Sequence, residues 1–291
     1  MFKGSIVALI TPFADGEVDE AALRKLVDWH VEQGTHAIVP CGTTGESPTL
    51  SHAEHERVTE IVVTQSGGRV PVIAGAGSNN TREAISLSKH AKEIGADAVL
   101  HVTGYYNKPT QEGIYQHFKA INDAVDIPII VYNIPPRAIV DISVETMARL
   151  AKLANVIGVK DATADLTRPS KEQMAIDGEW NQLSGEDGTA LAYMAHGGDG
   201  CISVTANVAP RLCSEFQQAC LAGDFKTALE YQHRLMPLHV NLFAETSPGP
   251  VKFAASELGL CSPEVRLPLV QPSDATKEKV RGALRHAGLL N

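Results

Sequence analysis

The sequence predicts an α/β protein, a (β/α)8 TIM barrel followed by a small C-terminal appendage of three helices. Three observations support this prediction. Eight short apolar runs alternate with eight helix-forming stretches over residues 5–222. Strands with a helix on either side form a covered parallel sheet, and eight such units fit a closed barrel better than an open sheet. After the eighth unit, the remaining pattern is helical only.

Each predicted strand is a short run rich in β-branched and other apolar residues, the composition that favours strands. The segment after the first strand, TPFADGE (11–17), lacks the glycine-rich fingerprint with which open nucleotide-binding sheets begin. The eight runs are SIVALI (5–10), HAIVPC (36–41), VPVIAGA (70–76), DAVLHV (97–102), IPIIVY (127–132), VIGVK (156–160), NQLSG (181–185) and GCISV (200–204).

The helices between these strands carry apolar residues at helical spacing, such as Leu23, Leu26 and Val27 in the first helix. The second helix opens with Ser51 and Glu54, whose spacing predicts a capping box. The predicted helices span residues 20–33, 51–65, 81–94, 111–124, 144–154, 164–174, 189–196 and 210–222, and Gly223 stops the last of them.

The C-terminal part of the chain is predicted to form three helices. The first carries Leu235, Leu238 and Leu242 at helical spacing, and the break SPGP (247–250) separates it from VKFAASELGL. The last helix is expected near residues 276–287. We therefore divide the chain into a catalytic barrel domain, residues 1–223, and a C-terminal helical domain, residues 224–291.

Composition excludes several classes of partner. The formal net charge is −9, with no basic block, so neither nucleic acid nor an anionic membrane is an expected partner. No apolar run approaches the roughly 20 residues of a membrane span, and the N-terminus lacks a signal-peptide cleavage site. The 5 cysteines are odd in number and have no CxxC spacing, which indicates a reducing, cytoplasmic location and no zinc site. We expect no metal and no cofactor.

Polar side chains follow five of the predicted strands. In a TIM barrel the carboxyl ends of the strands form the working face, so these residues are expected to converge on one rim. They are Thr43, Thr44 and Glu46; Tyr105, Tyr106 and Asn107; Tyr132, Asn133 and Arg137; Lys160 and Asp161; and Gly185, Glu186 and Asp187.

The sixth strand ends on a lysine, which calls for an explanation. A lysine at a strand end can simply extend to solvent. Side chains alternate along a strand, however, so Val156, Gly158 and Lys160 share one face. If that face is inward, we expect Gly158 to leave open space below the amine, where desolvation favours the neutral, nucleophilic form. A neutral lysine attacks a ketone to form an imine, so Lys160 is the candidate nucleophile of a Schiff-base aldolase.

Imine chemistry needs a proton shuttle and a cation for a substrate carboxylate. Tyr132 offers a phenol that can pass protons through Thr44. Arg137 offers a planar guanidinium with two parallel donors, which suits a carboxylate. These residues complete a hypothetical site around Lys160.

Five motifs resemble the dihydrodipicolinate synthase family of pyruvate-dependent Schiff-base aldolases, and the likeness covers nearly the whole chain. The motifs are GTTGE (42–46), YYNKP (105–109), YNIPPR (132–137), GVKDAT (158–163) and ISVTAN (202–207). The resemblance implies that pyruvate condenses with L-aspartate 4-semialdehyde to give 4-hydroxy-tetrahydrodipicolinate, the first committed step of diaminopimelate and lysine biosynthesis.

The resemblance also implies a catalytic set. Lys160 would form the imine with pyruvate, and Tyr132, Thr44 and Tyr106 would form a proton relay. Tyr106 would enter the site of a neighbouring subunit, so the enzyme would be a homo-oligomer, usually a homotetramer.

Five residues are assigned to substrate binding. By resemblance, Thr43 and Thr44 would hold the pyruvate carboxylate, and Arg137 would bind the carboxylate of the semialdehyde. Gly185 and Ile202 would contribute backbone groups to the same pocket.

A regulatory site for L-lysine is implied by the same resemblance. A carboxylate there can pair with an ammonium group, while amide and phenol groups can hydrogen-bond to the ligand. The site would lie at a subunit interface and inhibit the enzyme. Its residues would be Ser47, His52, His55, Asn79, Glu83 and Tyr105.

The chain departs from the family pattern at four positions. Gly104 replaces a proline and would loosen the loop that carries Tyr106. Ala138 replaces a threonine and removes a hydroxyl near the aldehyde site, while Asp161 replaces a frequent glutamate. Pro48 replaces a small residue in the lysine site and would alter affinity there.

Three other functions would use parts of the same residue pattern. A pyruvate aldolase that takes a sugar-derived aldehyde would use the same nucleophile, and only the aldehyde would differ. A metal-dependent aldolase would need a third ligand beside His52 and His55, and the sequence offers none at metal spacing. A non-catalytic sensor on this scaffold would not need the complete set of Lys160, Tyr132, Thr44 and Arg137.

Overall fold

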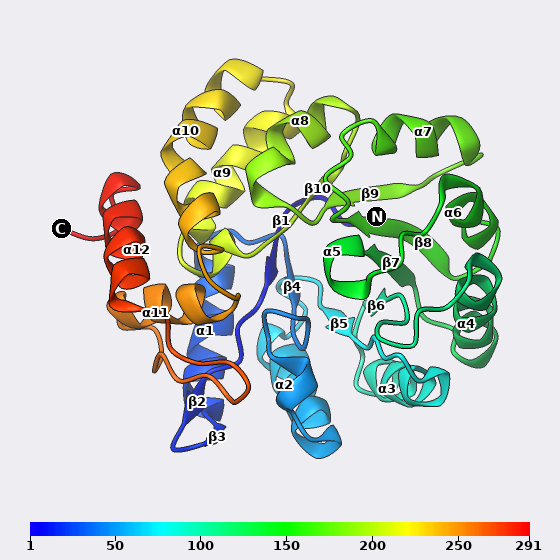
Figure 1. Cartoon of the computed structure of the whole chain (residues 1–291), viewed down its shortest axis with the longest axis horizontal. Coiled ribbons are helices and arrows are strands. Elements are labelled where there is room, and N and C mark those ends of the chain that lie inside the picture. Colours follow the sequence, from blue (N-terminus) through cyan, green and yellow to red (C-terminus); the bar gives the residue numbers. More distant parts are fainter.

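Eight parallel strands form the barrel wall in the computed structural model, which describes residues 1–291 (Figure 1). Hydrogen-bonded neighbours follow the order β4-β1-β10-β9-β8-β7-β6-β5, and a parallel bridge between Ile38 and Val72 brings the two ends of the sheet together. The predicted (β/α)8 barrel is confirmed. Its strands are β1 (Gly4–Ala8), β4 (Ala37–Val39), β5 (Ile73–Gly75), β6 (Ala98–Val102), β7 (Ile129–Asn133), β8 (Val156–Asp161), β9 (Asn181–Ser184) and β10 (Gly200–Ser203).

Eight helices surround the strands, one after each, as the sequence predicts (Figure 1). The predicted capping box is present at the second helix, because Ser51 accepts from the Glu54 amide and Glu54 accepts from the Ser51 amide. The helices are α1 (Glu20–Glu32), α2 (His52–Ser66), α3 (Thr81–Glu93), α4 (Gln111–Ala124), α6 (Val144–Leu150), α7 (Arg168–Ala175), α8 (Ala190–Ala195) and α9 (Pro210–Leu221).

Helix α7 begins later than the predicted residue 164. Ala164 has a left-handed φ of 65°, which a helix cannot contain. Asp165 then accepts hydrogen bonds from the amide and hydroxyl of Thr167, which hold a turn just before the helix. The side-chain hydrogen bonds of this turn therefore set the start of α7.

Several short elements were not predicted. They are a hairpin of β2 (Phe13–Ala14) and β3 (Glu17–Val18), the four-residue helix α5 (Pro135–Ala138), and the single turns η1 (Ser47–Thr49), η2 (Asp187–Thr189) and η3 (Thr205–Asn207). The sequence contains a signal for the hairpin, the pair Asp15-Gly16. Both residues have positive φ and form the two-residue turn that such hairpins prefer. The helix and the three turns all follow carboxyl ends of barrel strands, where the site lies.

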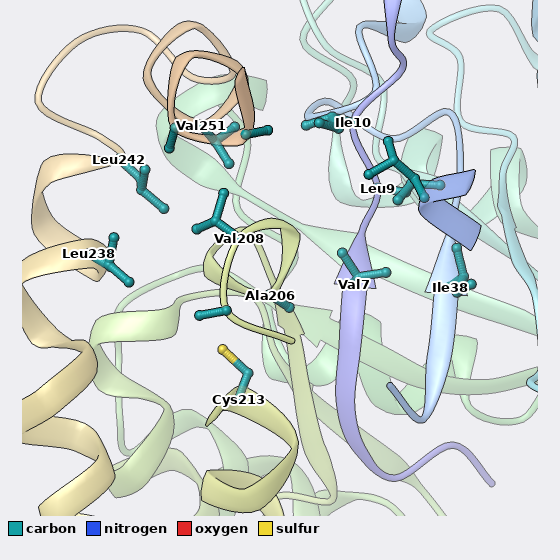
Figure 2. Packing of buried hydrophobic residues seen from close by; sticks show 14 of the residues in the cluster. Val7, Leu9, Ile10, Ile38, Ala206, Val208, Cys213, Leu238, Leu242 and Val251 are labelled. Carbon is teal, nitrogen blue, oxygen red and sulfur yellow. The ribbon is translucent and has the colours of Figure 1, made fainter. Parts of the chain in front are cut away.

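The three predicted C-terminal helices are present as α10 (Phe225–Asn241), α11 (Gly249–Glu257) and α12 (Asp274–His286). Figure 2 shows Leu238 of α10, Leu242 just after this helix and Val251 of α11 facing Val208, which follows β10. These residues belong to one cluster of 36 buried residues that also includes barrel residues such as Val7. The helices thus share a continuous apolar core with one side of the barrel.

The inside of the barrel is filled by a separate apolar cluster that includes Ile130, Tyr132 and Leu183. Lys160 pairs in register with Tyr132 on one side and Leu183 on the other, so it also points inward. The expected open space at Gly158 is absent, because an added Cβ would lie 2.3 Å from the carbonyl oxygen of Asn181. That prediction was wrong: Gly158 instead allows β9 to approach β8 closely.

Arg266 attaches the segment between α11 and α12 to the barrel. Its guanidinium donates to both carboxylate oxygens of Glu54, at 2.5 and 3.0 Å, and to the carbonyl oxygens of Thr49 and Gly16 at 3.0 and 2.8 Å. The hydrogen bonds from Arg266 lower the pKa of Glu54 to about 2. The ionised carboxylate therefore stabilises the folded state.

This pKa predicts a pH-dependent effect of Glu54→Gln. The unfolded carboxyl titrates near 4.5, so its contribution is fully present above that pH and is lost as the pH falls toward 2. We expect the urea midpoint to be lower for the variant than for the wild type at pH 6 to 8, and this difference to shrink between pH 5 and 3.

The control is Glu60→Gln, whose ion pair with Arg57 is about half exposed and should contribute little at any of these pH values. A difference between wild type and Glu54→Gln that is as large at pH 3 as at pH 7 would contradict the assignment.

Candidate active site

Lys160 lies at the carboxyl end of β8, at the mouth of the barrel, and only 7% of its surface is exposed. Its ammonium nitrogen is 4.1 Å from the ring centre of Tyr132, which is also buried. No carboxylate lies within ion-pair distance of it. The neighbouring Asp161 is on the other face of the strand, where its carboxylate accepts a hydrogen bond from the Thr163 amide at 2.8 Å. Lys160 is thus a buried amine without a counter-ion.

A small inner cavity of about 50 Å³ opens onto Lys160. Tyr132, Thr43 and Ser47 contribute hydroxyl groups to its lining, and small residues such as Ala8 and Gly75 form much of the wall. The remaining lining residues are Val39, Cys41, Gly42, Gly77, Leu100 and Val102. A small molecule in this cavity would contact the amine and the phenol together.

A larger outer cavity of about 410 Å³ adjoins the inner one, since Thr43, Ser47, Gly77 and Val102 line both. Arg137 is in its wall, and its α5 neighbours Ile134 and Ala138 line the same side. The other residues of the wall are Pro48, Leu50, His52, His55, Glu83, Leu87 and Tyr105. One chain therefore presents a continuous hollow that runs from Lys160 past Arg137 to the surface.

The loop after β4 carries the two predicted threonines. It enters and leaves in a left-handed conformation, with φ of 53° at Cys41 and 57° at Glu46. Thr43 lines both cavities, whereas Thr44 is buried and lines neither. Tyr132 and Thr44 are two members of the predicted proton relay. No hydrogen bond joins them in this structure.

Tyr106 lies outside both cavities of its own chain. It has a left-handed φ of 68° and is 94% exposed. The preceding Gly104 is packed, because an added Cβ would lie 3.2 Å from Asn107 and from Pro109. Asn107 also donates to the carbonyl oxygen of Asn79 at 2.9 Å. The loop therefore holds the phenol of Tyr106 out in solvent.

Gly185 and Ile202 lie beside the inner site. An added Cβ at Gly185 would lie 2.9 Å from Cβ of Ala162 and 3.0 Å from the carbonyl oxygen of Asp161, so glycine permits the close approach to the end of β8; the same Cβ would lie 3.2 Å from Cε of Lys160. The Gly185 amide donates to the Asp161 carbonyl at 2.6 Å, which leaves its own carbonyl as the group available to a ligand. Ile202 is buried in the barrel interior and pairs with Ile6. Neither residue lines either of the two cavities.

The predicted lysine-site residues come together at the outer cavity. His52 lies 2.5 Å from Glu83, and Glu83 also accepts a hydrogen bond from Ser78. That hydrogen bond lowers the pKa of Glu83, while burial lowers the pKa of His55 to about 4. At neutral pH the site thus combines an anionic Glu83 with a neutral His55.

Five of the six predicted residues line this cavity, and the sixth, Asn79, donates to the Tyr105 carbonyl at 3.2 Å. Sequence reasoning missed Ser78, which orients Glu83. Its signal was the Ser-Asn-Asn run just before α3, which also supplies the cap of that helix.

The fold and the site together define a class of protein. A (β/α)8 barrel with a buried, unpaired lysine and a tyrosine at the carboxyl ends of adjacent strands is an enzyme scaffold for carbonyl chemistry.

Comparison with known proteins identifies the family. The dihydrodipicolinate synthetase family matches residues 1–287, and the chain belongs to this family. It is 68% identical over 291 residues to the 4-hydroxy-tetrahydrodipicolinate synthase of Parvibaculum lavamentivorans, with 100% of both chains covered.

Two solved structures bear on the site. The chloride-inhibited dihydrodipicolinate synthase of Acinetobacter baumannii, complexed with pyruvate, is 49% identical, with a TM-score of 0.97 and full coverage of both chains. The dihydrodipicolinate synthase (DHDPS) of Cyanidioschyzon merolae, with lysine bound, is 36% identical, with a TM-score of 0.96 and 99% of both chains covered.

Proposed function

We propose that the chain condenses pyruvate with L-aspartate 4-semialdehyde to give 4-hydroxy-tetrahydrodipicolinate, the first committed step of diaminopimelate and lysine biosynthesis. The observation that carries this proposal is the buried amine of Lys160, which has no counter-ion and faces a cavity of about 50 Å³. Membership of the dihydrodipicolinate synthetase family supports the choice of substrates. The enzyme acts in the cytoplasm and needs no cofactor.

The reaction begins when the Lys160 amine attacks C2 of pyruvate. The carbinolamine loses water to give an imine, and loss of a proton from the pyruvate methyl group gives an enamine. The enamine carbon then bonds to the aldehyde carbon of the semialdehyde, whose oxygen takes up a proton. The amino group of the semialdehyde finally attacks the imine carbon, which closes the ring and releases Lys160.

Tyr132 is the proton carrier for these steps, because its ring is in contact with the Lys160 ammonium and lines the same cavity. We propose that Thr44 and the partner subunit's Tyr106 complete the relay. The exposure of Tyr106 supports this assignment, since a 94% exposed tyrosine is available to a second copy of the chain. A homotetramer is the proposed assembly.

The two carboxylates of the substrates have different sites in this proposal. Thr43 and Thr44 hold the pyruvate carboxylate next to Lys160, and Gly185 and Ile202 contribute backbone groups to that pocket. Arg137 binds the carboxylate of the semialdehyde in the outer cavity, where its guanidinium is free of ion pairs. Ala138 is next to Arg137 and supplies no hydroxyl to the aldehyde. For this reason a sugar-derived aldehyde stays the alternative second substrate.

The outer cavity also supports inhibition by L-lysine. The ammonium groups of the bound L-lysine would be attracted by the anionic Glu83, while Asn79 and Tyr105 supply neutral hydrogen-bonding groups. Ser47, His52 and His55 complete the proposed site. A lysine-bound relative supports the assignment. Because this wall and Arg137 border the same hollow, a ligand at one end changes the surroundings of the other.

The first prediction tests the imine. Pyruvate followed by borohydride should attach one reduced pyruvate per chain, and peptide mapping should place it on Lys160. Lys160→Ala should lose the label and the activity, whereas Lys108→Ala, an exposed lysine in the loop of Tyr106, should keep the label. Full activity of Lys160→Ala would end the Schiff-base proposal. Assays of pyruvate with the semialdehyde and with sugar-derived aldehydes decide the second substrate.

The second prediction concerns Arg137→Ala. A charge-assisted hydrogen bond contributes about 1.5–3 kcal/mol, so the KM for the semialdehyde should rise by roughly 10- to 100-fold while the KM for pyruvate stays the same. Arg149→Ala, which removes an exposed pair with Glu112, is the control and should leave both values unchanged. Selective loss of pyruvate binding in Arg137→Ala would reverse the two carboxylate assignments.

The third prediction concerns regulation. Millimolar L-lysine should lower the rate without displacing pyruvate, and Glu83→Ala should relieve the inhibition because the ligand loses its anionic partner. Glu93→Ala, at the far end of the same helix, should remain inhibited. An unchanged rate at saturating lysine, with no heat of binding in calorimetry, would refute the regulatory site and leave the catalytic proposal intact.

A further inference from the structure

A buried ion pair links the C-terminal helices to the loop that carries Thr43 and Thr44. Lys252 of α11 donates to Oε1 of Glu46 at 2.7 Å, and neither side chain has any exposed surface. The two residues are 206 positions apart in the sequence. A buried charge is costly unless it is paired, so neither residue can lose its partner without a change in the surrounding structure.

Both oxygens of Glu46 are held. Oε2 accepts a hydrogen bond from the backbone amide of Arg266 at 3.0 Å. The ammonium of Lys252 and the guanidinium of Arg266 also lie 4.0 and 4.3 Å from the ring centre of Phe13, which is fully buried. The segment from α11 to Arg266 therefore holds the Glu46 carboxylate through two hydrogen-bond donors, the Lys252 ammonium and the Arg266 amide. The Phe13 ring contacts both cations and fixes their positions.

The backbone of Glu46 connects these contacts to the loop that carries Thr43 and Thr44. Its left-handed φ of 57° is unusual for a residue other than glycine, and such a conformation persists only where the surroundings enforce it. The Glu46 amide donates to the carbonyl oxygen of Thr43 at 3.1 Å, and the Thr49 hydroxyl donates to the Glu46 carbonyl at 3.0 Å. The conformation of Glu46 thus determines how the loop closes around Thr43.

We propose that Lys252 is a positioning residue for the active site: by holding Glu46, it fixes the loop whose threonines bind the pyruvate carboxylate. Lys252 lines neither cavity and touches no substrate. The inference rests on the proposed function, since it names the pyruvate end of that site. Without the ion pair the left-handed turn relaxes, Thr43 moves, and pyruvate binds more weakly while the amine of Lys160 remains in place.

Two variants test this inference. Lys252→Met removes the cation and leaves a buried carboxylate unpaired, while Glu46→Gln combined with Lys252→Met removes both charges at similar volume. Neutral replacement of a buried pair usually preserves folding. The control is Arg281→Met on α12, which removes an ion pair with Glu257 of α11 within the same appendage and leaves the pair of Glu46 with Lys252 intact.

The measurement is the pyruvate concentration that gives half-maximal borohydride labelling of Lys160, together with KM and kcat, on protein shown by circular dichroism to be folded. Both Lys252 variants should need at least about tenfold more pyruvate, because small displacements of binding groups cost up to about 10²-fold. The change should be larger in the KM for pyruvate than in kcat. Arg281→Met should label like the wild type.

The outcomes separate the two proposals. If the wild type itself gives no adduct, the proposed function fails. If the wild type is labelled and the folded double variant labels at the same pyruvate concentration, the positioning role of Lys252 is overturned. An equal loss in Arg281→Met would also overturn it, because the effect would then belong to the appendage as a whole. The double variant decides the question if Lys252→Met does not fold.

Discussion

The register of β7, β8 and β9 at their carboxyl ends is the constraint on which the site depends. It sets Lys160 level with Tyr132 on one side and Leu183 on the other, and it points the amine into the barrel. Two glycines make this geometry possible. Gly158 lets β9 approach closely one pleat below, and Gly185 lets the chain after β9 approach Asp161 and Ala162 closely beside Lys160. A parallel barrel cannot shift one strand by a single residue without turning Lys160 outward.

The loop after β4 depends on a different support. Its left-handed ends at Cys41 and Glu46 are not stabilised by glycine, so they require contacts from elsewhere in the fold. The buried pair of Glu46 with Lys252 supplies one of these contacts from the C-terminal helices. We propose that residues 224–291 form a helical domain that completes the catalytic barrel of residues 1–223, and that its role is to hold this loop as well as to cover the apolar side of the barrel.

Much of this structure was readable in the sequence. Alternating apolar runs and helices predicted all eight strands and the eleven longer helices, because local periodicity reports burial on each face. Alternation along the strand placed Gly158 and Lys160 on one face, and the structure shows that this face is inward; Val156, expected on the same face, instead lies in the outer cluster with Val159, because the pairing of β7 with β8 shifts register between Ile129 and Ile130. The ion pair between Glu46 and Lys252 had no local signal, since its partners are 206 residues apart. The space at Gly158 was misjudged for a similar reason: a glycine indicates a close approach, but the sequence does not say which strand approaches.

The positions of the candidate site residues could be predicted from the sequence to different extents, for physical reasons. Strand ends converge by topology, so Lys160, Tyr132 and Thr43 could be placed on one rim. The exposure of Tyr106 depends on the conformation of its own loop, and the shape of the outer cavity depends on short segments such as η1 and α5; hydrophobic periodicity predicts neither. The single chain consequently shows a hollow that runs from the amine to Glu83, while the contact between Tyr132 and Thr44 is not formed in it.

The central claim is that Lys160 bonds covalently to pyruvate inside the barrel. A crystal structure of the protein grown with pyruvate tests it most directly. The account predicts continuous density from Nζ of Lys160 to C2 of the ligand, with the ligand carboxylate at Thr43 and Thr44 and the loop of Glu46 unmoved. Pyruvate bound without a covalent bond, or bound only beside Arg137 in the outer cavity, would contradict it.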